Sequence, residues 1–272
     1  MLCALLVFDG PQFPATLEQM SFWVDMLNKS VDSMLAAYSA LPHRRFMKTH
    51  TPLDGLPIRD DVTYVVVGRD PRDVVVSMEH HMANMNIDRF LELRAQAVGL
   101  DDLAEIGVPP TPSNDPGERF REFVQSSAVG RLTLASVLHH LDTAWQRRHE
   151  PNIAMFHYAD YRADLPSELI RLAAALDIDL TPTRAEDLAG EASLDRMRDR
   201  ADEVVPNAST GQWKNNSAFL RSGSSGEWRA RCDDGDLVAY ERRVSALVSP
   251  ELAAWAHLGR AGSGVDPNAV VD

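Results

Sequence analysis

The chain contains little cysteine, and this scarcity excludes two kinds of stabilisation. Its 272 residues include two cysteines, Cys3 and Cys232, which stand far apart and lack the CxxC or Cys/His spacing of a zinc site. A disulfide framework or a structural metal is therefore not expected, and we predict two reduced, buried thiols. A chain of this length buries roughly 70 to 75% of its unfolded surface, so its core needs neither.

The sequence also has no long hydrophobic run. No apolar stretch approaches the ~18 residues that a membrane-spanning helix requires. The apolar residues 1–8 lack the basic leader of a signal peptide. We therefore predict no membrane span and a cytoplasmic location.

Positive charge is scarce as well. The sequence has 27 Lys and Arg against 40 Asp and Glu, a net charge of −13, so most of its surface repels a phosphate backbone and we expect no nucleic-acid partner. Only Lys29, Lys48 and Lys214 are lysines, an arginine bias typical of GC-rich bacterial genomes. Where any cation would suffice such a genome supplies Arg, so each remaining Lys is a candidate for specific chemistry.

The N-terminal third carries helix and strand signals. Residues 2–8 are apolar without alternation, which fits either a buried strand or a buried helix. Thr16 and Gln19 form a capping-box pattern, and the apolar residues after it recur at helical spacing, which predicts a helix ending near Leu35. Residues 45–50 form a short extended segment, which places His50 at the end of a strand.

Strands then alternate with helices. The β-branched run at 62–67 predicts a fully buried parallel strand. Asp70 as N-cap and Pro71 at the first helical position predict a helix through His81. A further strand at 153–158 lies between predicted helices at 132–149 and 167–176.

This order of elements predicts the fold class. Strands that alternate with helices indicate an α/β protein with a central parallel sheet flanked by helices. We expect one domain over 1–260 and a flexible C-terminal tail over 261–272. The Pro-rich loop 108–117 is long enough to be a lid.

Three polar residues follow the predicted strands. His50, Arg69 and Tyr158 stand at carboxyl ends of strands, where open parallel sheets bind ligands. Arg69 and Ser77, eight residues apart across a helix start, could contact one anion. The alternative is that Arg69 pairs with Asp73 and Ser77 only packs, and the pattern leaves both open.

Lys48 and His50 are two residues apart, so both point to the same face of a strand. His50 could take the proton of an attacking hydroxyl while Lys48 neutralises charge on a transferred group. Structural hydrogen bonding of His50 is the alternative. A Gly/Ser-rich loop at 219–226 carries Arg221 and could bring backbone N–H groups to a phosphate, although a linker or a turn has the same composition.

Together these segments resemble the cytosolic-type sulfotransferases, which move a sulfonate group from 3′-phosphoadenosine 5′-phosphosulfate (PAPS) to a hydroxyl or amine and release adenosine 3′,5′-bisphosphate (PAP). Residues 45–53, RFMKTHTPL, are similar to the family's Lys-Thr-His-x-Pro stretch. The resemblance implies that His50 is the catalytic base and that Lys48 contacts the phosphosulfate. Residues 64–77 resemble the segment in which the family's Arg and Ser hold the 3′-phosphate, which implies this role for Arg69 and Ser77.

Three further segments carry the resemblance. Residues 157–161 look like the family's Tyr-Glu-Asp element, which implies that Tyr158 lies near the adenine. Residues 192–194 are similar to its Thr-Ser-Phe stretch, which implies a nucleotide contact for Ser193. Residues 219–229 look like its Arg-Lys-Gly-x-x-Gly-Asp-Trp-Lys loop over the 3′-phosphate. The resemblance implies binding roles for Phe219, Leu220, Arg221, Ser222 and Gly223, with Ser222 in place of the family's Lys.

One part of the family pattern has no counterpart. Sulfotransferases of this kind begin with a strand and a Pro-Lys-Ser-Gly-Thr-Thr-Trp loop around the 5′-phosphosulfate, and nothing before Lys48 matches it. The resemblance thus implies a P-loop-NTPase-like sulfotransferase fold that is N-terminally truncated, with weaker donor binding and without the central strand of the sheet. Losing preorganised donors around a transferring group costs orders of magnitude in rate.

The resemblance leads to two hypotheses. The first is a PAPS-dependent sulfotransferase that acts on a small-molecule hydroxyl or amine and needs no metal. The second is a catalytically impaired nucleotide-binding or assembly protein derived from that fold. A phosphoryl-transfer kinase ranks last because the sequence has no GxxxxGK[ST] motif. The sequence leaves open whether the chain forms a homo-oligomer.

Overall fold

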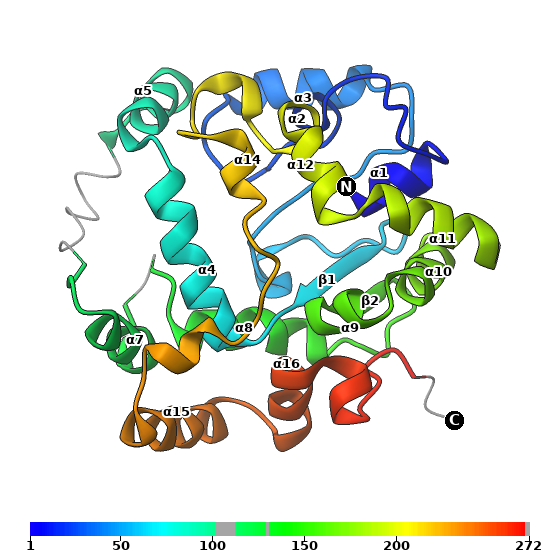
Figure 1. The fold of residues 1–272 in the computed structure, drawn as a ribbon. Coiled ribbons are helices and arrows are strands. Elements are labelled where there is room, and N and C mark those ends of the chain that lie inside the picture. Colours follow the sequence, from blue (N-terminus) through cyan, green and yellow to red (C-terminus); the bar gives the residue numbers. More distant parts are fainter. Residues whose placement is uncertain (102–111, 129–130, 270–272) are drawn as a thin grey trace. The chain divides into compact units, whose positions relative to one another are not determined.

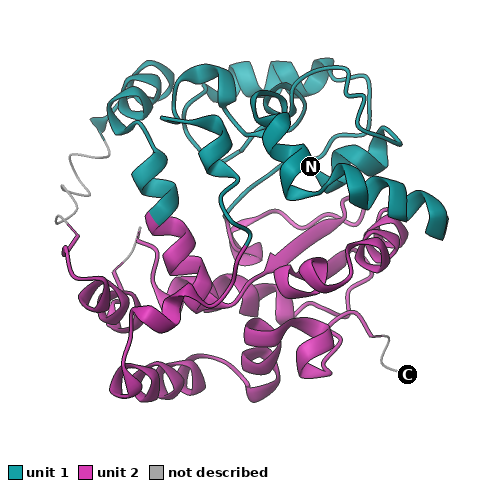
Figure 2. Cartoon of the chain, in the orientation of Figure 1, with its two compact units in different colours: residues 1–50, 80–110, 178–223 teal, residues 51–79, 111–177, 224–272 magenta. Residues whose placement is uncertain are grey.

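The computed structural model describes residues 1–101, 112–128 and 131–269. The chain packs into two compact units, each assembled from three separate segments (Figure 2). The segments of unit 1 are residues 1–50, 80–110 and 178–223, and those of unit 2 are residues 51–79, 111–177 and 224–272. The chain therefore leaves and re-enters each unit.

Unit 2 contains the sheet (Figure 1). Strand β1 (Tyr64–Gly68) and strand β2 (Ile153–His157) pair in parallel, in the register from Tyr64↔Ile153 to Gly68↔His157. Parallel neighbours require a long crossover connection, and the helices between residues 71 and 145, some of which belong to unit 1, lie within it. The predicted α/β class and both of these strands are confirmed.

The two strands differ in burial. Every residue of β2 is buried, but Val67 of β1 is 52% exposed. Successive side chains of a strand alternate between the faces of the sheet, and Val66 and Gly68 occupy the covered face of β1. The prediction of a fully buried strand at 62–67 is therefore wrong for β1, because an apolar run does not reveal which face its neighbours cover.

Helices build the core of unit 2 around the sheet. They are α7 (Pro116–Gln125), α8 (Leu134–Trp145), α9 (Tyr158–Ala163), α10 (Leu165–Ala175), α15 (Asp234–Leu247) and α16 (Pro250–Ser263), with the short turns η1 (Leu53–Gly55) and η3 (Glu227–Ala230). Gly68 packs directly on Trp255, since a Cβ at this position would lie 2.7 Å from the Trp255 ring. A side chain at the end of β1 would therefore displace a fully buried indole.

Helix α4 (Pro71–Asn84) begins at the predicted Pro71 and continues three residues beyond His81. The Asp70 carboxylate caps it by accepting a hydrogen bond from the Arg72 backbone N–H at 2.9 Å, and the same carboxylate pairs with the Arg72 guanidinium. The cap satisfies one of the donors left unpaired at a helix start. Asp70 therefore has a local partner and does not face the strand end with a free charge.

Unit 1 is helical. Residues 2–8 form helix α1 (Leu2–Val7), which settles the choice between strand and helix. The other helices are α2 (Leu17–Met20), α3 (Val31–Ala40), α5 (Ile87–Ala97), α11 (Pro182–Glu191), α12 (Leu194–Asp199), α13 (Ala201–Val204) and α14 (Asn216–Phe219), with the turn η2 (Ala208–Thr210).

The predicted helix ending near Leu35 is wrong in its extent. The capping box of Thr16 and Gln19 is present, but α2 ends at Met20 and α3 begins only at Val31. Backbone groups of Phe22 and Val24 instead pair with Lys48, at 3.1 Å and 2.9 Å. This tertiary pairing overrides the helical spacing of the apolar residues: Phe22 is buried, Trp23 and Met26 are half-buried and Leu27 is exposed.

The predicted strand over residues 45–50 is also corrected. This segment is extended, but it forms one isolated parallel bridge, between Trp23 and Lys48, and no strand. A ladder needs a partner of matching length, and the segment after α2 pairs with Lys48 alone. His50 therefore follows a bridge and not a strand end.

The two cysteines are less buried than predicted. Cys3 and Cys232 are free thiols, and both are half-buried. Helix α16 extends to Ser263, and the Asn268 amide exchanges two hydrogen bonds of 2.8 Å with the backbone of Met155 in β2. Part of the predicted lid, residues 108–111, lies outside the described residues.

Within the described ranges, no helix combines the length and apolar character needed to cross a membrane.

Candidate functional site

Three predicted segments meet in unit 2. Arg69 follows β1, and the centre of its guanidinium lies 4.6 Å from the centroid of the Tyr158 ring, at the start of α9. The Nη2 of Arg69 also donates to the carbonyl of Ser224 at 3.4 Å. The end of β1, the residue after β2 and the Gly/Ser-rich loop therefore lie around one cation.

The Gly/Ser-rich loop is hydrogen-bonded to α4. The backbone N–H of Gly226 donates to the buried Asp73 carboxylate at 2.8 Å, and Gly226 has a φ of 93°, a left-handed conformation that favours glycine. No ion pair joins Arg69 to Asp73 within the described part of the chain, so that alternative is not the arrangement observed. Ser77 lies one helical turn after Asp73 and is half-buried.

Arg69 retains an unused donor. Its Nε is buried and has no hydrogen-bond partner among the described residues. A buried donor without a partner costs free energy unless a ligand or water satisfies it. A phosphate oxygen suits a guanidinium, which presents its N–H groups in a fixed fork. The geometry of unit 2 therefore fits an anionic group beside Arg69.

A second group of candidates lies in unit 1, around Trp23. The His50 ring stacks on the Trp23 indole, with centroids 4.1 Å apart and planes inclined by 18°. The His50 side chain is 63% exposed, so a substrate can reach it. The Nζ of Lys48 lies 5.4 Å from the centroid of the same indole. Lys48 and His50 thus both contact the Trp23 indole.

Lys48 is a poorly solvated cation. Burial lowers the pKa of Lys48 to about 8 from its ordinary value of 10.5. No carboxylate pairs with its ammonium in the portion of the chain that is described. An unpaired, half-buried ammonium attracts an anion, because the anion restores the charge stabilisation that water no longer supplies.

The remaining predicted residues also belong to unit 1. Ser193 is the N-cap of α12 but makes no side-chain capping bond. Phe219 packs against Trp213, with ring centroids 5.0 Å apart, and the carbonyl of Leu220 accepts a hydrogen bond from Arg198 at 2.7 Å. Phe219 and Leu220 therefore have packing roles in unit 1, whatever else they contact. Arg221, Ser222 and Gly223 follow them and end the last segment of the unit.

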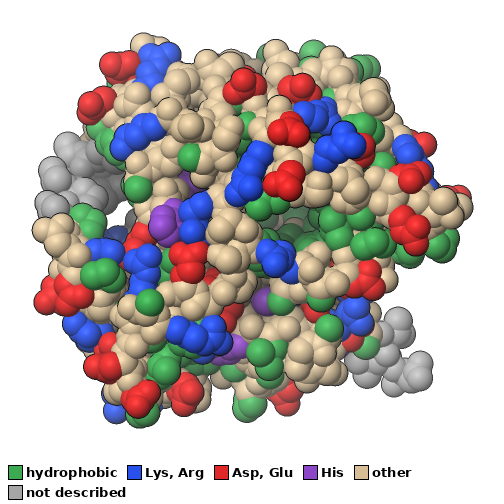
Figure 3. All heavy atoms as spheres, viewed as in Figure 1, with side chains coloured by type: hydrophobic (Ala, Val, Ile, Leu, Met, Phe, Trp, Pro, Cys, Tyr) green, Lys and Arg blue, Asp and Glu red, His purple; other side chains and the backbone are tan. Residues whose placement is uncertain are grey.

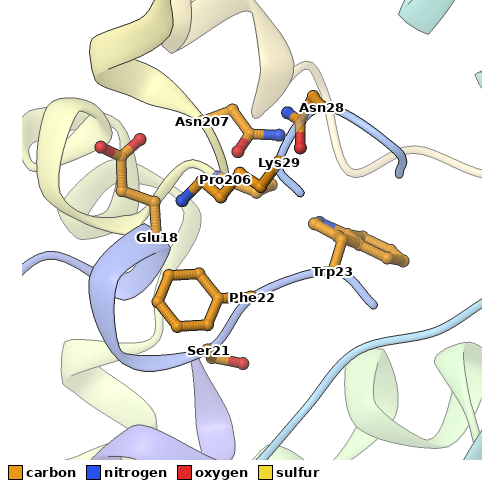
Figure 4. Close-up of a pocket in the computed structure, with 8 residues that line it drawn as sticks. All are labelled: Glu18, Ser21, Phe22, Trp23, Asn28, Lys29, Pro206 and Asn207. Atoms are coloured by element: carbon orange, nitrogen blue, oxygen red, sulfur yellow. The ribbon is translucent and has the colours of Figure 1, made fainter. Parts of the chain in front are cut away.

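Trp23 is a functional candidate that the sequence prediction missed. Its helical spacing assigned it to a helix, but its bridge to Lys48 places it against His50. It also lines a small pocket within unit 1 (Figure 4). The other residues that line this pocket are Glu18, Ser21, Phe22, Asn28, Lys29, Pro206 and Asn207.

The pocket combines apolar and polar surfaces. The Nζ of Lys29 lies 4.4 Å from the centroid of the Phe22 ring, and burial lowers the pKa of Lys29. Glu18 accepts hydrogen bonds from Ser209, and Asn28 donates to Gln212 at 3.2 Å. The cavity has room for about one water molecule, so it is too small to enclose an organic ligand.

The charge distribution does not suggest one large basic surface. On the face shown in Figure 3, acidic and basic side chains are interspersed. Among the described residues no group of three or more His, Cys, Asp or Glu side chains could hold a metal ion. The candidate anion contacts are therefore individual cations such as Arg69 and Lys48.

Comparison with known proteins identifies close sequence relatives. Residues 4–243 match the sulfotransferase domain family. A glycolipid sulfotransferase of Mycobacterium bovis (strain BCG / Pasteur 1173P2) is 45% identical over 276 residues, which cover 96% of this chain and 84% of the relative. A glycolipid sulfotransferase of Mycobacterium tuberculosis (strain ATCC 25177 / H37Ra) is 44% identical over 277 residues, again 96% of this chain and 84% of the relative. These relatives support a bacterial origin.

Solved structures share the fold. A retinol dehydratase in complex with androsterone and the inactive cofactor PAP superposes with a TM-score of 0.56 and 25% identity, over 82% of this chain and 62% of that one. The mouse sulfotransferase SULT7A1 complexed with PAP superposes with a TM-score of 0.62 and 15% identity, over 92% of this chain and 79% of that one. The helix-rich α/β arrangement with its parallel sheet is thus the fold of sulfotransferases.

Proposed function

This chain belongs to the sulfotransferase family, and from that premise we propose that it transfers a sulfonate group from PAPS to a hydroxyl group of a small acceptor, with His50 as general base. The observation that carries the proposal is the pair in unit 1. The exposed His50 imidazole stacks on Trp23 and stands two residues from the half-buried Lys48 ammonium, which has no carboxylate partner among the described residues. A base and a cation of this kind are what transfer of an anionic group requires.

Cationic and hydroxyl groups are proposed to hold the donor. The guanidinium of Arg69, with its unpartnered Nε, and the hydroxyl of Ser77 are proposed to bind the 3′-phosphate, together with Arg221 and the loop that follows it. Tyr158, already against Arg69, is proposed to lie on the adenine side. PAPS supplies the activated sulfonate, and the cofactor PAP bound in both structural relatives supports this choice of nucleotide.

The chemical step assigns one task to each residue of the pair. His50 takes the proton of the acceptor hydroxyl at its free ring nitrogen, which makes the oxygen nucleophilic. Lys48 offsets the negative charge of the group being transferred and of the departing phosphate. Neither task needs a metal ion.

The acceptor is proposed to be a glycolipid or a similar amphipathic alcohol. Both mycobacterial relatives carry the name glycolipid sulfotransferase. The unit 1 pocket beside Trp23 has room for about one water molecule and does not itself hold such an acceptor (Figure 4). A hydroxyl that contacts the Trp23 indole would be near the base, because the indole stacks on His50.

The first test is calorimetric titration of the chain with PAP, with adenosine 5′-monophosphate as the control that lacks the 3′-phosphate. Micromolar or tighter binding that depends on the 3′-phosphate is expected. Sulfonate transfer is then measured as PAP release in the presence of a glycolipid that has free sugar hydroxyl groups. PAP binding without transfer to any hydroxyl would favour the non-catalytic alternative, and absence of binding would contradict the proposal.

The lowered pKa of Lys48 predicts a pH dependence of nucleotide binding. Below its pKa of about 8 the side chain is charged before the nucleotide binds, and above it the nucleotide must first drive protonation. The affinity for PAP should therefore be level near pH 7 and should fall above pH 8, by at most about tenfold per pH unit. Titration calorimetry between pH 7 and 9.5 measures this slope.

The Lys48→Arg variant is the control, because a guanidinium stays charged throughout this range. It should bind PAP with little pH dependence, and an unchanged slope in the variant would assign the effect to another group. In the protein without nucleotide, the effect of Lys48 on the free energy of unfolding has the opposite pH dependence. The unfolded chain holds the Lys48 proton to about pH 10.5 and the folded chain releases it near 8, so this residue makes the free energy of unfolding rise between those values.

A further inference from the structure

Two segments of unit 1 run side by side and in the same direction near His50. The parallel bridge joins Trp23 to Lys48, with hydrogen bonds from the Lys48 N–H to Phe22 and from the Val24 N–H to Lys48. Residues that follow such a bridge by the same number of positions remain neighbours. Asp25, two residues after Trp23, therefore lies beside His50, two residues after Lys48.

The Asp25 carboxylate contacts His50 at more than one point. Its Oδ2 accepts hydrogen bonds from the His50 backbone N–H at 2.5 Å and from the Thr49 hydroxyl at 3.1 Å, and it lies 3.6 Å from the Nδ1 of the His50 ring. Its Oδ1 is buried and has no hydrogen-bond partner within the described residues. The carboxylate is thus held beside the ring, with Oδ2 at ion-pair distance from Nδ1 and slightly beyond hydrogen-bond length.

We propose that Asp25 is a positioning residue for His50: it holds the neutral ring in the Nδ1–H form and leaves the Nε2 lone pair to accept the acceptor proton. This inference rests on the proposed function of His50 as the base. The tautomer of a histidine is set by the hydrogen bond that its other nitrogen makes. The Trp23 indole, stacked at 4.1 Å, limits rotation of the ring out of this orientation.

Asp25 itself is poorly suited to be the base. Burial alone would raise the pKa of Asp25, but the hydrogen bonds from His50 and Thr49 outweigh it and lower the pKa below its ordinary value of 3.8. A carboxylate stabilised in this way accepts a proton reluctantly. The role that remains is orientation of the imidazole and stabilisation of its charged form after proton transfer.

Asp25→Asn tests the proposal without a change of size. The amide oxygen in the place of Oδ2 can still accept the backbone N–H of His50, but it is an uncharged and therefore weaker acceptor for Nδ1–H, so the preference for this tautomer should fall. Ring-nitrogen NMR of the donor-free chain, with His50 assigned by its own substitution, should show the Nδ1–H form in the parent and a shift toward the Nε2–H form in the variant. In PAPS-dependent transfer, kcat should fall about 100-fold with KM changed by less than about twofold.

Two variants complete the test. Asp25→Glu restores the carboxylate and should recover a large part of both the tautomer signal and kcat. Asp60→Asn removes an exposed carboxylate and should change neither. An unaltered His50 tautomer in Asp25→Asn, or an equal loss of kcat in Asp25→Asn and Asp25→Glu, would overturn the positioning role.

The two readouts also separate this inference from the proposed function. The NMR measurement needs no donor and no turnover, so it reports on Asp25 even in a chain that transfers no sulfonate. A tautomer shift in a chain without activity would sustain the Asp25–His50 coupling and contradict the proposed reaction. Loss of kcat without a tautomer shift would be compatible with the proposed reaction but would contradict the role of Asp25 in setting the His50 tautomer.

Discussion

His50→Ala is expected to lower kcat for sulfonate transfer by about 10²- to 10⁴-fold, the range that a positioned general base contributes. The affinity for PAP should stay within about twofold of the parent, because the proposed 3′-phosphate contacts come from Arg69, Ser77 and Arg221. Turnover is measured as PAP release, and affinity by calorimetry on the same preparation. This split between rate and affinity is the expected result for a base.

His149→Ala is the matched control, since His149 is exposed and lies in unit 2, and it should leave both quantities unchanged. Thermal unfolding of each variant checks the fold, because His50→Ala also removes the stack on Trp23. A parallel loss of turnover and PAP affinity would show that His50 is structural. Full activity in His50→Ala would assign the base to another residue.

Arg69→Ala is expected to weaken PAP binding by about 1.5 to 3 kcal/mol, the scale of hydrogen bonds to a charged group, which is roughly a 10- to 150-fold rise in Kd. The loss should be smaller for adenosine 5′-monophosphate, which has no 3′-phosphate. The buried Nε without a partner is the structural reason, because it gains an acceptor only when the nucleotide is bound.

Two further variants are needed to interpret the change in PAP affinity of Arg69→Ala. Arg69→Lys keeps the charge but loses the fork of donors, so its affinity should fall between the parent and the alanine variant. Arg162→Ala removes an exposed arginine of α9 and should bind PAP as the parent does. If Arg69→Ala weakened both nucleotides equally, the cation would act on the 5′ side or through the Tyr158 ring, and the 3′-phosphate assignment would be wrong.

Local patterns predicted many of the elements correctly. The start of α4 at Pro71, both strands of the sheet and the capping box of Thr16 depend on neighbours within a few residues, so short stretches of sequence contain the necessary information. The family resemblance is of the same kind, because its motifs are short contiguous segments. The site residues that these motifs name remain predictions that the experiments above must test.

The incorrect predictions of helix extent and strand burial share a different cause. Residues 21–30 leave the helix because Phe22 and Val24 pair with the backbone of Lys48, more than 20 positions away. The exposure of Val67 depends on which face of β1 the helices cover. No periodicity within a segment reveals a partner that comes from elsewhere in the chain.

The same distinction holds for the site. The sequence by itself determined the fold class, the family and the identity of the candidate base and phosphate ligands, because these are properties of composition and of short motifs. Only the tertiary structure placed Trp23 and Asp25 against His50, and Tyr158 against Arg69. Those contacts join residues 25 or more positions apart, and their geometry arises from the packing of whole segments.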